Sequence, residues 1–502
     1  MLVVLWCCCS CPSLLMHLSL LLAAAPFVLA APTPVAEPAS ISVPQTGSLT
    51  GVINAVLDSG SLKSAVPAVI SDGAQLVDAM VPVFEALANG TLHGTDVPAV
   101  VQKLFHAVQP TATPTSVGDA MSRAADIWGV KSASAAPAPA PNILTNALSL
   151  LLEGFTSSDI RAVAAGASPF TNTATNSNRP VPAANRFYNN VQGNAPFSVS
   201  EATLRAALYI PPAFTWGQKQ PILMSPGTGA TSSVNFQSNI GKLLAQELNA
   251  DPVYLNVPQA LLGDIQDNAE FVAYALQYLY ATTGQKPAIV TWSQGSLDAQ
   301  WSFKYWPSIP KIVTGHIAIS PDYHGTSLAY IVCPGFGTGN DIACTPALLQ
   351  QEFNSRLVTR LRSNGGDSAY VPTTTIYSAV DEIVQPQQGT AASGYLQDAR
   401  AVGASNTFLQ GACLGQPAGL IYLHEGVLFN PVAYALVVDA LMHPGPGSFA
   451  RVQDQCAAAV APGLGLADVI QAESLIPLVV INILSYMPKV TTEPALKSYA
   501  NH

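Results

Sequence analysis

One serine stands where an apolar stretch meets a small polar one. Ser293 follows "AIVTW" (288–292) and precedes "QGSLDAQW", which has the pattern of a helix. A hydroxyl is a poor nucleophile at neutral pH until a base takes its proton during attack. The letters "TWSQG" resemble the strand-to-helix turn G-x-S-x-G, with Thr291 in place of the first glycine. The position therefore predicts a displayed, reactive serine.

An acid and a base that could serve this serine come later in the chain. Asp381 follows the strand-like "TTTIYSA" in a loop, and Glu382 is its rival. His424 ends the apolar run "GLIYL" before a helix pattern, where a strand-end loop is expected. His443 and His502 look like loop or tail residues. The predicted catalytic set, in the order serine, acid, base, is Ser293, Asp381 and His424.

Donors for a developing oxyanion are also present. The backbone N–H of Gln294 follows the serine, and the glycine-flanked turn "SPGTGATS" offers Thr228 with both an N–H and a hydroxyl. The alternative is that this segment is only a tight turn. A phosphate-binding loop is excluded because no Gly-Lys-Ser/Thr follows.

The surrounding elements alternate between strand and helix. Short apolar strands are predicted at "PILMS", "PVYLN", "PAIVTW", "HIAIS" and "TTTIYSA", with helices at "SNIGKLLAQELNA" and "DNAEFVAYALQYLYATTG". This alternation predicts an α/β fold with a mostly parallel sheet covered by helices. Ligands of such sheets bind beyond the carboxyl ends of the strands, where Ser293 is expected.

The first part of the chain has a different character. Residues 1–30 are predicted to be a signal peptide, although the usual positive n-region is missing and a membrane anchor stays open. Residues 31–180 are predicted to be a helical extension and linker, interpreted as a pro-region, spacer or chaperone-like cover. Residues 181–502 form the predicted catalytic domain. Asn89 lies in a glycosylation sequon.

The composition of the chain limits which kinds of molecule the protein can bind. Of the 502 residues only 10% are charged, and the net charge is −10, which gives nucleic acid nothing to bind. A surface with so few charged residues is typical of a protein that acts near lipid. Uncharged Ser/Thr/Pro/Ala-rich segments also lower the percentage of charged residues. Four cysteines lie beyond the signal, with spacing wrong for zinc and three disulfide pairings open: Cys333, Cys344, Cys413 and Cys456. No metal or other cofactor is predicted.

Five segments, "PILMSPGTGATS", "IVTWSQGSLDAQW", "ISPDYHGT", "VPTTTIYSAVDEIVQPQ" and "ACLGQ…HEG", resemble the Candida antarctica lipase B family in order and spacing. The resemblance covers roughly residues 195–464. It implies a secreted triacylglycerol lipase or esterase with an α/β-hydrolase fold and no cofactor. Its triad would be the set given above, with Thr228 and Gln294 as oxyanion hole and a Cys413–Cys456 bridge. The resemblance also implies pocket residues, namely Trp292, Asp322, Gln351, Ile383 and Gln385.

The chain departs from that family in several places. The N-terminal extension is longer, and Leu423 stands where the family has an aspartate beside the histidine. The tail "LADVIQAESLIPLVVINILSYMPK" predicts an apolar helix, too short around Pro477 to span a bilayer. The resemblance implies that this helix covers the pocket.

The competing hypotheses are a noncatalytic, hydrolase-like secreted binding protein and an esterase or acyltransferase without interfacial preference. The expected partner is a lipid or ester, at an oil–water interface for a lipase, with no stable protein partner.

Overall fold

The computed structural model describes residues 110–134, 143–158, 160–161, 176–247, 249–329 and 344–501, all within the compact unit Ser48–His502. The predicted signal segment, Asn89 and Cys333 lie outside the described residues. The strands are β1 (Leu208–Tyr209), β2 (Gln220–Ser225), β3 (Ala250–Leu255), β4 (Ala288–Trp292), β5 (His316–Ile319), β6 (Thr373–Tyr377) and β7 (Ala404–Phe408).

These strands form one sheet in the order β1-β3-β2-β4-β5-β6-β7. Strand β1 is antiparallel to β3, and every other neighbouring pair is parallel. After β2 the chain turns to β3 on one side and then returns to β4 on the other. The strand order therefore reverses between β2 and β4, which is where open α/β sheets bind ligands.

The helices of the described residues are α5 (Val117–Ile127), α6 (Ile143–Leu152), α8 (Glu201–Ala206), α9 (Ser232–Phe236), α10 (Ile240–Leu244), α11 (Ile265–Thr283), α12 (Gln294–Tyr305), α14 (Pro346–Gln350), α15 (Arg356–Arg362), α16 (Leu409–Ala412), α17 (Pro431–Met442), α18 (Phe449–Val452), α19 (Leu466–Glu473) and α20 (Leu475–Ser485). Short 3₁₀ turns are η1 (Ala183–Asn185), η2 (Pro258–Leu261), η3 (Ile309–Lys311), η4 (Gly389–Ala391), η5 (Pro417–Gly419), η6 (Gly426–Phe429), η7 (Gln453–Ala457) and η8 (Ser498–Ala500).

Alternate strand residues face two separate apolar cores. Leu223 and Ile289 pack with the buried faces of α11 and α12, whereas Met224 and Val290 pack with α17, α19 and α20. Both faces of the central strands are therefore buried, which is why β2, β4 and β5 are mainly apolar.

All five predicted strands are present. The helix predicted over 267–284 is α11, which begins at the Asp264 cap and ends at Gly284 in a left-handed conformation (φ 71°). The helix predicted over 238–250 is wrong in extent, because α10 covers only five residues. Strands β1 and β7 were not predicted: β1 has two residues, and β7 ("ASNTF") is largely polar and lies at the sheet edge.

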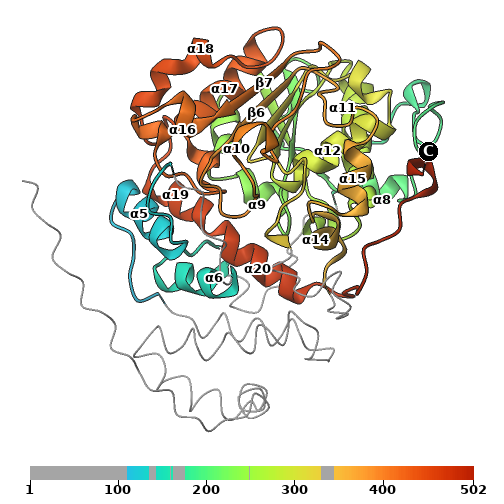
Figure 1. The fold of residues 1–502 in the computed structure, drawn as a ribbon. Helices are drawn as coiled ribbons and strands as arrows, with labels where there is room; N and C mark the ends of the chain where they lie inside the picture. The colour runs from blue at the N-terminus through green and yellow to red at the C-terminus, as the bar shows by residue number, and fades with distance from the viewer. Residues whose placement is uncertain are drawn as a thin grey trace, which may run out of the picture. The chain divides into compact units, whose positions relative to one another are not determined.

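Helices α5 and α6 pack against the C-terminal helices α19 and α20, although more than 300 residues separate them in sequence (Figure 1). Their buried residues, such as Ala124 and Leu148, belong to the same core as those of α20. These helices fall within the predicted N-terminal extension. The boundary at residue 180 stays a prediction.

Pro477 does not divide the apolar tail as expected. It is the third residue of α20, where the backbone N–H has no intrahelical partner and proline is tolerated. The run Leu466–Ser485 has 20 residues, long and apolar enough to cross a membrane by length and composition alone, so the expectation of a run that is too short is wrong. The run is nevertheless 72% buried within the protein, as core helices are.

Candidate active site

Ser293 occupies a sharp turn between β4 and α12. Its backbone has φ 53° and ψ −129°, a strained conformation for a non-glycine residue. Gly295 makes the turn possible, since a Cβ there would lie 2.5 Å from the carbonyl oxygen of Pro226. Gly227 is required for the same reason, because its Cβ would lie 2.6 Å from the Trp292 ring. The serine is 5% exposed and lines a cavity.

His424 and Asp381 form a buried pair. The ring Nδ1 of His424 lies 2.8 Å from Oδ2 of Asp381, and both side chains are at most 1% exposed. The other carboxylate oxygen, Oδ1, accepts N–H bonds from Ile383 (3.0 Å) and Val384 (2.7 Å), which fix the orientation of the acid. The other ring nitrogen of His424, Nε2, has no hydrogen-bond partner among the described residues, and His424 lines the same cavity as Ser293.

The rival acid Glu382 contacts the histidine elsewhere. Its Oε2 accepts the backbone N–H of His424 at 2.8 Å, so it holds the main chain and not the ring. The carbonyl oxygen of His424 accepts from Ser320 Oγ (2.9 Å) and from Trp292 Nε1 (3.3 Å). The histidine is thus fixed at its N–H, its C=O and its ring.

The histidine lies in a loop, not at a strand end as predicted. Residues 420–425 connect η5 to η6, and the apolar side chains of Tyr422 and Leu423 are buried in the core. An apolar run alone could not distinguish a buried loop from a buried strand.

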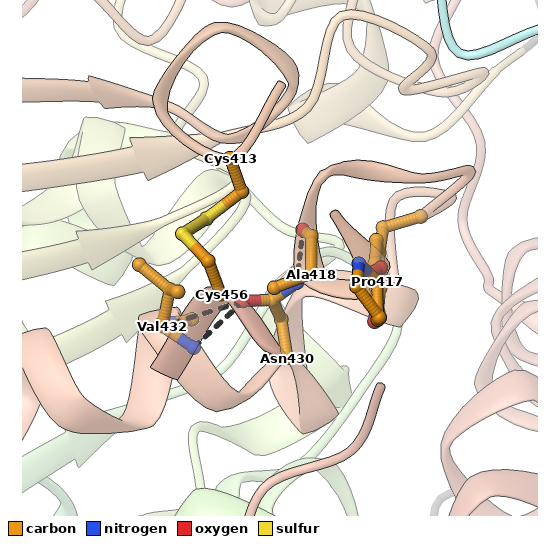
Figure 2. The surroundings of a disulfide bond; sticks show 8 residues. Cys413, Pro417, Ala418, Asn430, Val432 and Cys456 are labelled. Carbon is orange, nitrogen blue, oxygen red and sulfur yellow. Dashed lines mark hydrogen bonds between the residues drawn. A yellow bond between two sulfur atoms is a disulfide. The ribbon is translucent and has the colours of Figure 1, made fainter. Parts of the chain in front are cut away.

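Covalent and polar links hold this loop on both sides. A Cys413–Cys456 disulfide, the pairing that the resemblance implies, joins the end of α16 to η7 (Figure 2). Asn430 Nδ2 donates to the Ala418 carbonyl (2.9 Å), while its Oδ1 accepts the N–H of Val432 (2.9 Å). Cys344 is also disulfide-bonded.

The predicted oxyanion donors meet at the turn after β2. Gln294 is the first residue of α12, so its N–H is among those a helix leaves without an intrahelical partner. The Thr228 hydroxyl lies 2.7 Å from Oε1 of Gln294 and 2.9 Å from Oε1 of Gln351. Gln351 Nε2 donates to the same Gln294 oxygen (2.9 Å), so two amides orient the threonine.

The cavity next to Ser293 has a volume of ≈ 50 Å³ and a mainly apolar wall. Of the predicted pocket residues it brings together Trp292, Gln351 and Ile383. Asp322 and Gln385 are not among its described lining residues: Asp322 is fully buried beside Ser393, and Gln385 Nε2 donates to the Asp381 carbonyl. Apolar lining also comes from α6, α14 and α20, namely Ile143, Leu348, Ile476, Val479 and Ile483.

Thr291 stands where the turn usually has glycine, and the structure supplies a physical reason for it. The Thr291 hydroxyl lies 2.7 Å from Ser296 Oγ and 2.8 Å from Nε2 of His316, all three being buried. This links β4 to the first turn of α12 across Ser293. Burial lowers the pKa of His316 to about 3, so this histidine stays neutral.

Three buried carboxyl groups also lie near the site; Asp322 was predicted as a pocket residue, whereas Asp298 and Glu352 were not predicted. Burial raises the pKa values of Asp298 and Asp322 well above their usual range. The charge of Asp322 raises the pKa of Asp298 further, and the charge of Asp381 raises that of Asp322 further. Burial, followed by the charge of Glu493, raises the pKa of Glu352 to about 8. Among the described residues, no group of three or more His, Cys, Asp or Glu side chains is arranged to hold a metal ion.

These shifts predict that stability falls as pH rises from about 6.5 to 8. The unfolded chain ionises its glutamates near 4.5, whereas folded Glu352 keeps its proton up to about 8, so the unfolded state is favoured across this window. Burial also lowers the pKa values of four bases, but these do not affect the same pH window. His316 and His324 bind protons differently in the folded and unfolded states only below about pH 6.5. Lys304 and Lys489 do so only above about pH 8.

The measurement is the free energy of unfolding by denaturant at pH 6.5 and pH 8. Glu352→Gln should flatten the decline by up to about 1.4 kcal/mol per pH unit. Glu153→Gln, at a surface residue paired with Arg123, is the matched control and should leave the slope unchanged. Stability that rises across this window would contradict the prediction.

A strained serine, an oriented histidine–carboxylate pair and a parallel sheet whose switch point lies beneath them define the α/β-hydrolase class. The chain is 38% identical to "Lipase B" of Pseudozyma antarctica over 251 residues, which cover 49% of this chain and 68% of that protein. The crystal structure of Aspergillus fumigatus lipase B matches with 40% identity and a TM-score of 0.72, covering 85% of this chain and 99% of that one. No family model matches the chain. The chain belongs to the lipase B family and is an ester hydrolase.

Proposed function

We propose that this protein is a secreted lipase or esterase that hydrolyses carboxylic esters, triacylglycerols included, through an acyl-enzyme on Ser293. The observation that carries the proposal is the Asp381–His424 pair, 2.8 Å apart and buried, in the wall of the cavity that Ser293 also lines. Both relatives bear the name lipase.

In the first step Ser293 Oγ attacks the ester carbonyl while Nε2 of His424 takes its proton. Asp381 keeps the remaining ring proton on Nδ1, so that Nε2 is the free acceptor. His424 then gives the proton to the departing alcohol, and water or another alcohol repeats the sequence to release the acyl group. The N–H groups of Thr228 and Gln294 are the proposed donors to the oxyanion. The Thr228 hydroxyl is a third once it rotates away from the two glutamine oxygens that it contacts in the free enzyme.

The wall of the cavity favours an apolar acyl chain. Side chains of α6 and α20 form part of that wall, so an acyl chain in the cavity would contact them. Ile143 of α6 lines the cavity, so the extension contributes directly to the proposed acyl site.

Export is supported by the Cys413–Cys456 disulfide, because such bonds persist in oxidising compartments. Cleavage of the signal and glycosylation of Asn89 stay predictions, as do the absence of a cofactor and of a stable protein partner.

The test is covalent labelling of the full-length protein with a fluorophosphonate, which reacts only with an activated serine. Labelling that is saturable and blocked by a substrate ester is expected, whereas an unlabelled protein would support the noncatalytic alternative. Rates on a tributyrin emulsion and on a dissolved short ester then distinguish a lipase from a non-interfacial esterase, since only a lipase gains rate above the solubility limit.

A further inference from the structure

A second cavity lies at the end of the sheet opposite Ser293. Its volume is ≈ 370 Å³, within the range of sites that hold small organic molecules. Three segments enclose it, namely residues 185–191, the last two turns of α11 and the chain around η3. Gly284 and Ile312 line it shortly before β4 and β5 begin, whereas Ser293 follows the end of β4. No described residue lines both cavities, so this one is separate from the proposed acyl site.

Hydrogen bonds within the protein hold the walls of this cavity apart. Asn185 Nδ2 donates to the Ala281 carbonyl at 2.8 Å, which fixes the first segment to the end of α11. Asn194 Nδ2 donates to Ser308 Oγ at 2.8 Å, and the Ser308 N–H donates to Asn194 Oδ1 at 3.1 Å. These two bonds fix the same segment to the chain before η3. The cavity is therefore formed before any ligand binds, as most small-molecule sites are.

The lining of the cavity is mainly apolar and carries no charge. Phe187, Val191 and Ile312 supply apolar surface, and Tyr280, which is 38% exposed, adds a second aromatic ring. None of the described lining residues is acidic or basic. A charged ligand would lose hydration there without gaining a counter-ion, so the lining favours a neutral molecule.

Gln277 is the buried polar residue of this lining. It is 4% exposed, and its Nε2 has no hydrogen-bond partner among the described residues. Its Oε1 accepts no hydrogen bond from that part of the chain either. Proteins bond nearly all their buried polar groups, because a buried amide without a partner costs free energy. The amide turns about a soft torsion, so it can present its donor and its acceptor to a ligand in the cavity.

We propose that this cavity binds a small neutral molecule with an apolar body and an amide or hydroxyl head group. Gln277 binds the head group, because such a group both donates and accepts hydrogen bonds as the side-chain amide does. Ser308 is a further donor, since its hydroxyl accepts from Asn194 and its own proton has no acceptor among the described residues. Phe187 and Tyr280 pack against the body, which favours an aromatic ring. Binding there does not depend on the reaction proposed for Ser293.

The test is the binding of para-fluorobenzamide to the full-length protein, measured by fluorine NMR. Two compounds of similar shape accompany it: para-fluorobenzoate has a charged head group, and fluorobenzene has none. We expect saturable binding of the amide, and binding at least about tenfold weaker for the other two. Treatment of the protein with a fluorophosphonate beforehand should leave the affinity unchanged, because that reagent blocks only the cavity beside Ser293.

Gln277→Leu removes the head-group partner and should weaken binding of the amide by on the order of tenfold. Leucine leaves no amide unpaired, so Q277L should melt no lower than the parent. Gln300→Leu is the matched control, since Gln300 is also buried but its Nε2 donates to the carbonyls of Gly366 (2.9 Å) and Ser368 (3.0 Å). Q300L should melt lower than the parent and bind para-fluorobenzamide with the parent's affinity.

Ala281→Phe places a ring inside the cavity and should abolish binding, and if A281F does not fold, Q277L decides alone. The proposal is overturned if para-fluorobenzamide does not bind saturably, if Q277L binds it as tightly as the parent, or if either comparison compound binds as tightly. Loss of binding after fluorophosphonate treatment also overturns it, because the ligand would then occupy the acyl site. Ester hydrolysis should be equal in the parent and Q277L, so a failure here leaves the proposed function unaffected.

Discussion

Replacing Ser293 with alanine should lower kcat for ester hydrolysis by on the order of 10⁴-fold or more. The variant keeps the cavity and the Asp381–His424 pair but has no oxygen to form the acyl-enzyme. Alanine at φ 53° bears the same kind of backbone strain as serine, so the fold should be preserved. The measurement is the rate on a p-nitrophenyl ester, together with fluorophosphonate labelling, which should disappear.

Ser296→Ala provides the control for this prediction. Ser296 lies in the first turn of α12, and its hydroxyl hydrogen-bonds to the Thr291 side chain, so it bears on the turn and not on the reaction. This variant should keep labelling and most of its rate. Wild-type hydrolysis by purified S293A would place the nucleophile elsewhere and end the proposed mechanism.

The central part of the fold could be predicted because its signals are local. Strands β2 and β4 are buried on both faces, so "PILMS" and "PAIVTW" are mainly apolar, and "PAIVTW" ends where a helix pattern begins. Strand β7 could not be predicted in this way, because it pairs on one side only and keeps polar side chains. The packing of α6 against α20 was equally inaccessible, since nothing local indicates which distant face an amphipathic helix will cover.

The same distinction between local and tertiary signals applies to the site. The order of residues along the chain suggested Ser293, Asp381 and His424, and the structure brings them together beyond the carboxyl ends of the parallel strands. The sequence alone could not show which of two neighbouring carboxyl groups contacts the histidine ring. Asp381 and Glu382 are adjacent carboxylates of similar chemistry, and only the three-dimensional contacts direct the first to the imidazole ring and the second to the backbone N–H.

Because Asp381 is the acid that contacts the imidazole ring, we expect Asp381→Asn to cause the second large loss of activity. The Ile383 and Val384 N–H groups need an acceptor, so the asparagine oxygen should stay with them and its NH₂ should face the histidine. Nδ1 of His424 would then have to accept a hydrogen bond, which places the ring proton on Nε2. Because Nε2 could no longer take the proton of Ser293, kcat should fall by about 10⁴-fold with KM little changed.

Glu382→Gln is the variant that discriminates between the two acids. The amide oxygen of glutamine can still accept the His424 N–H now bonded to Glu382 at 2.8 Å, so a loss below about tenfold in kcat is expected. Both variants should be measured at pH 6 on the same dissolved ester, with thermal unfolding checked in parallel. If E382Q lost as much activity as D381N, the histidine would depend on both carboxylates alike, and the assignment of Asp381 as the sole partner of the ring would be wrong.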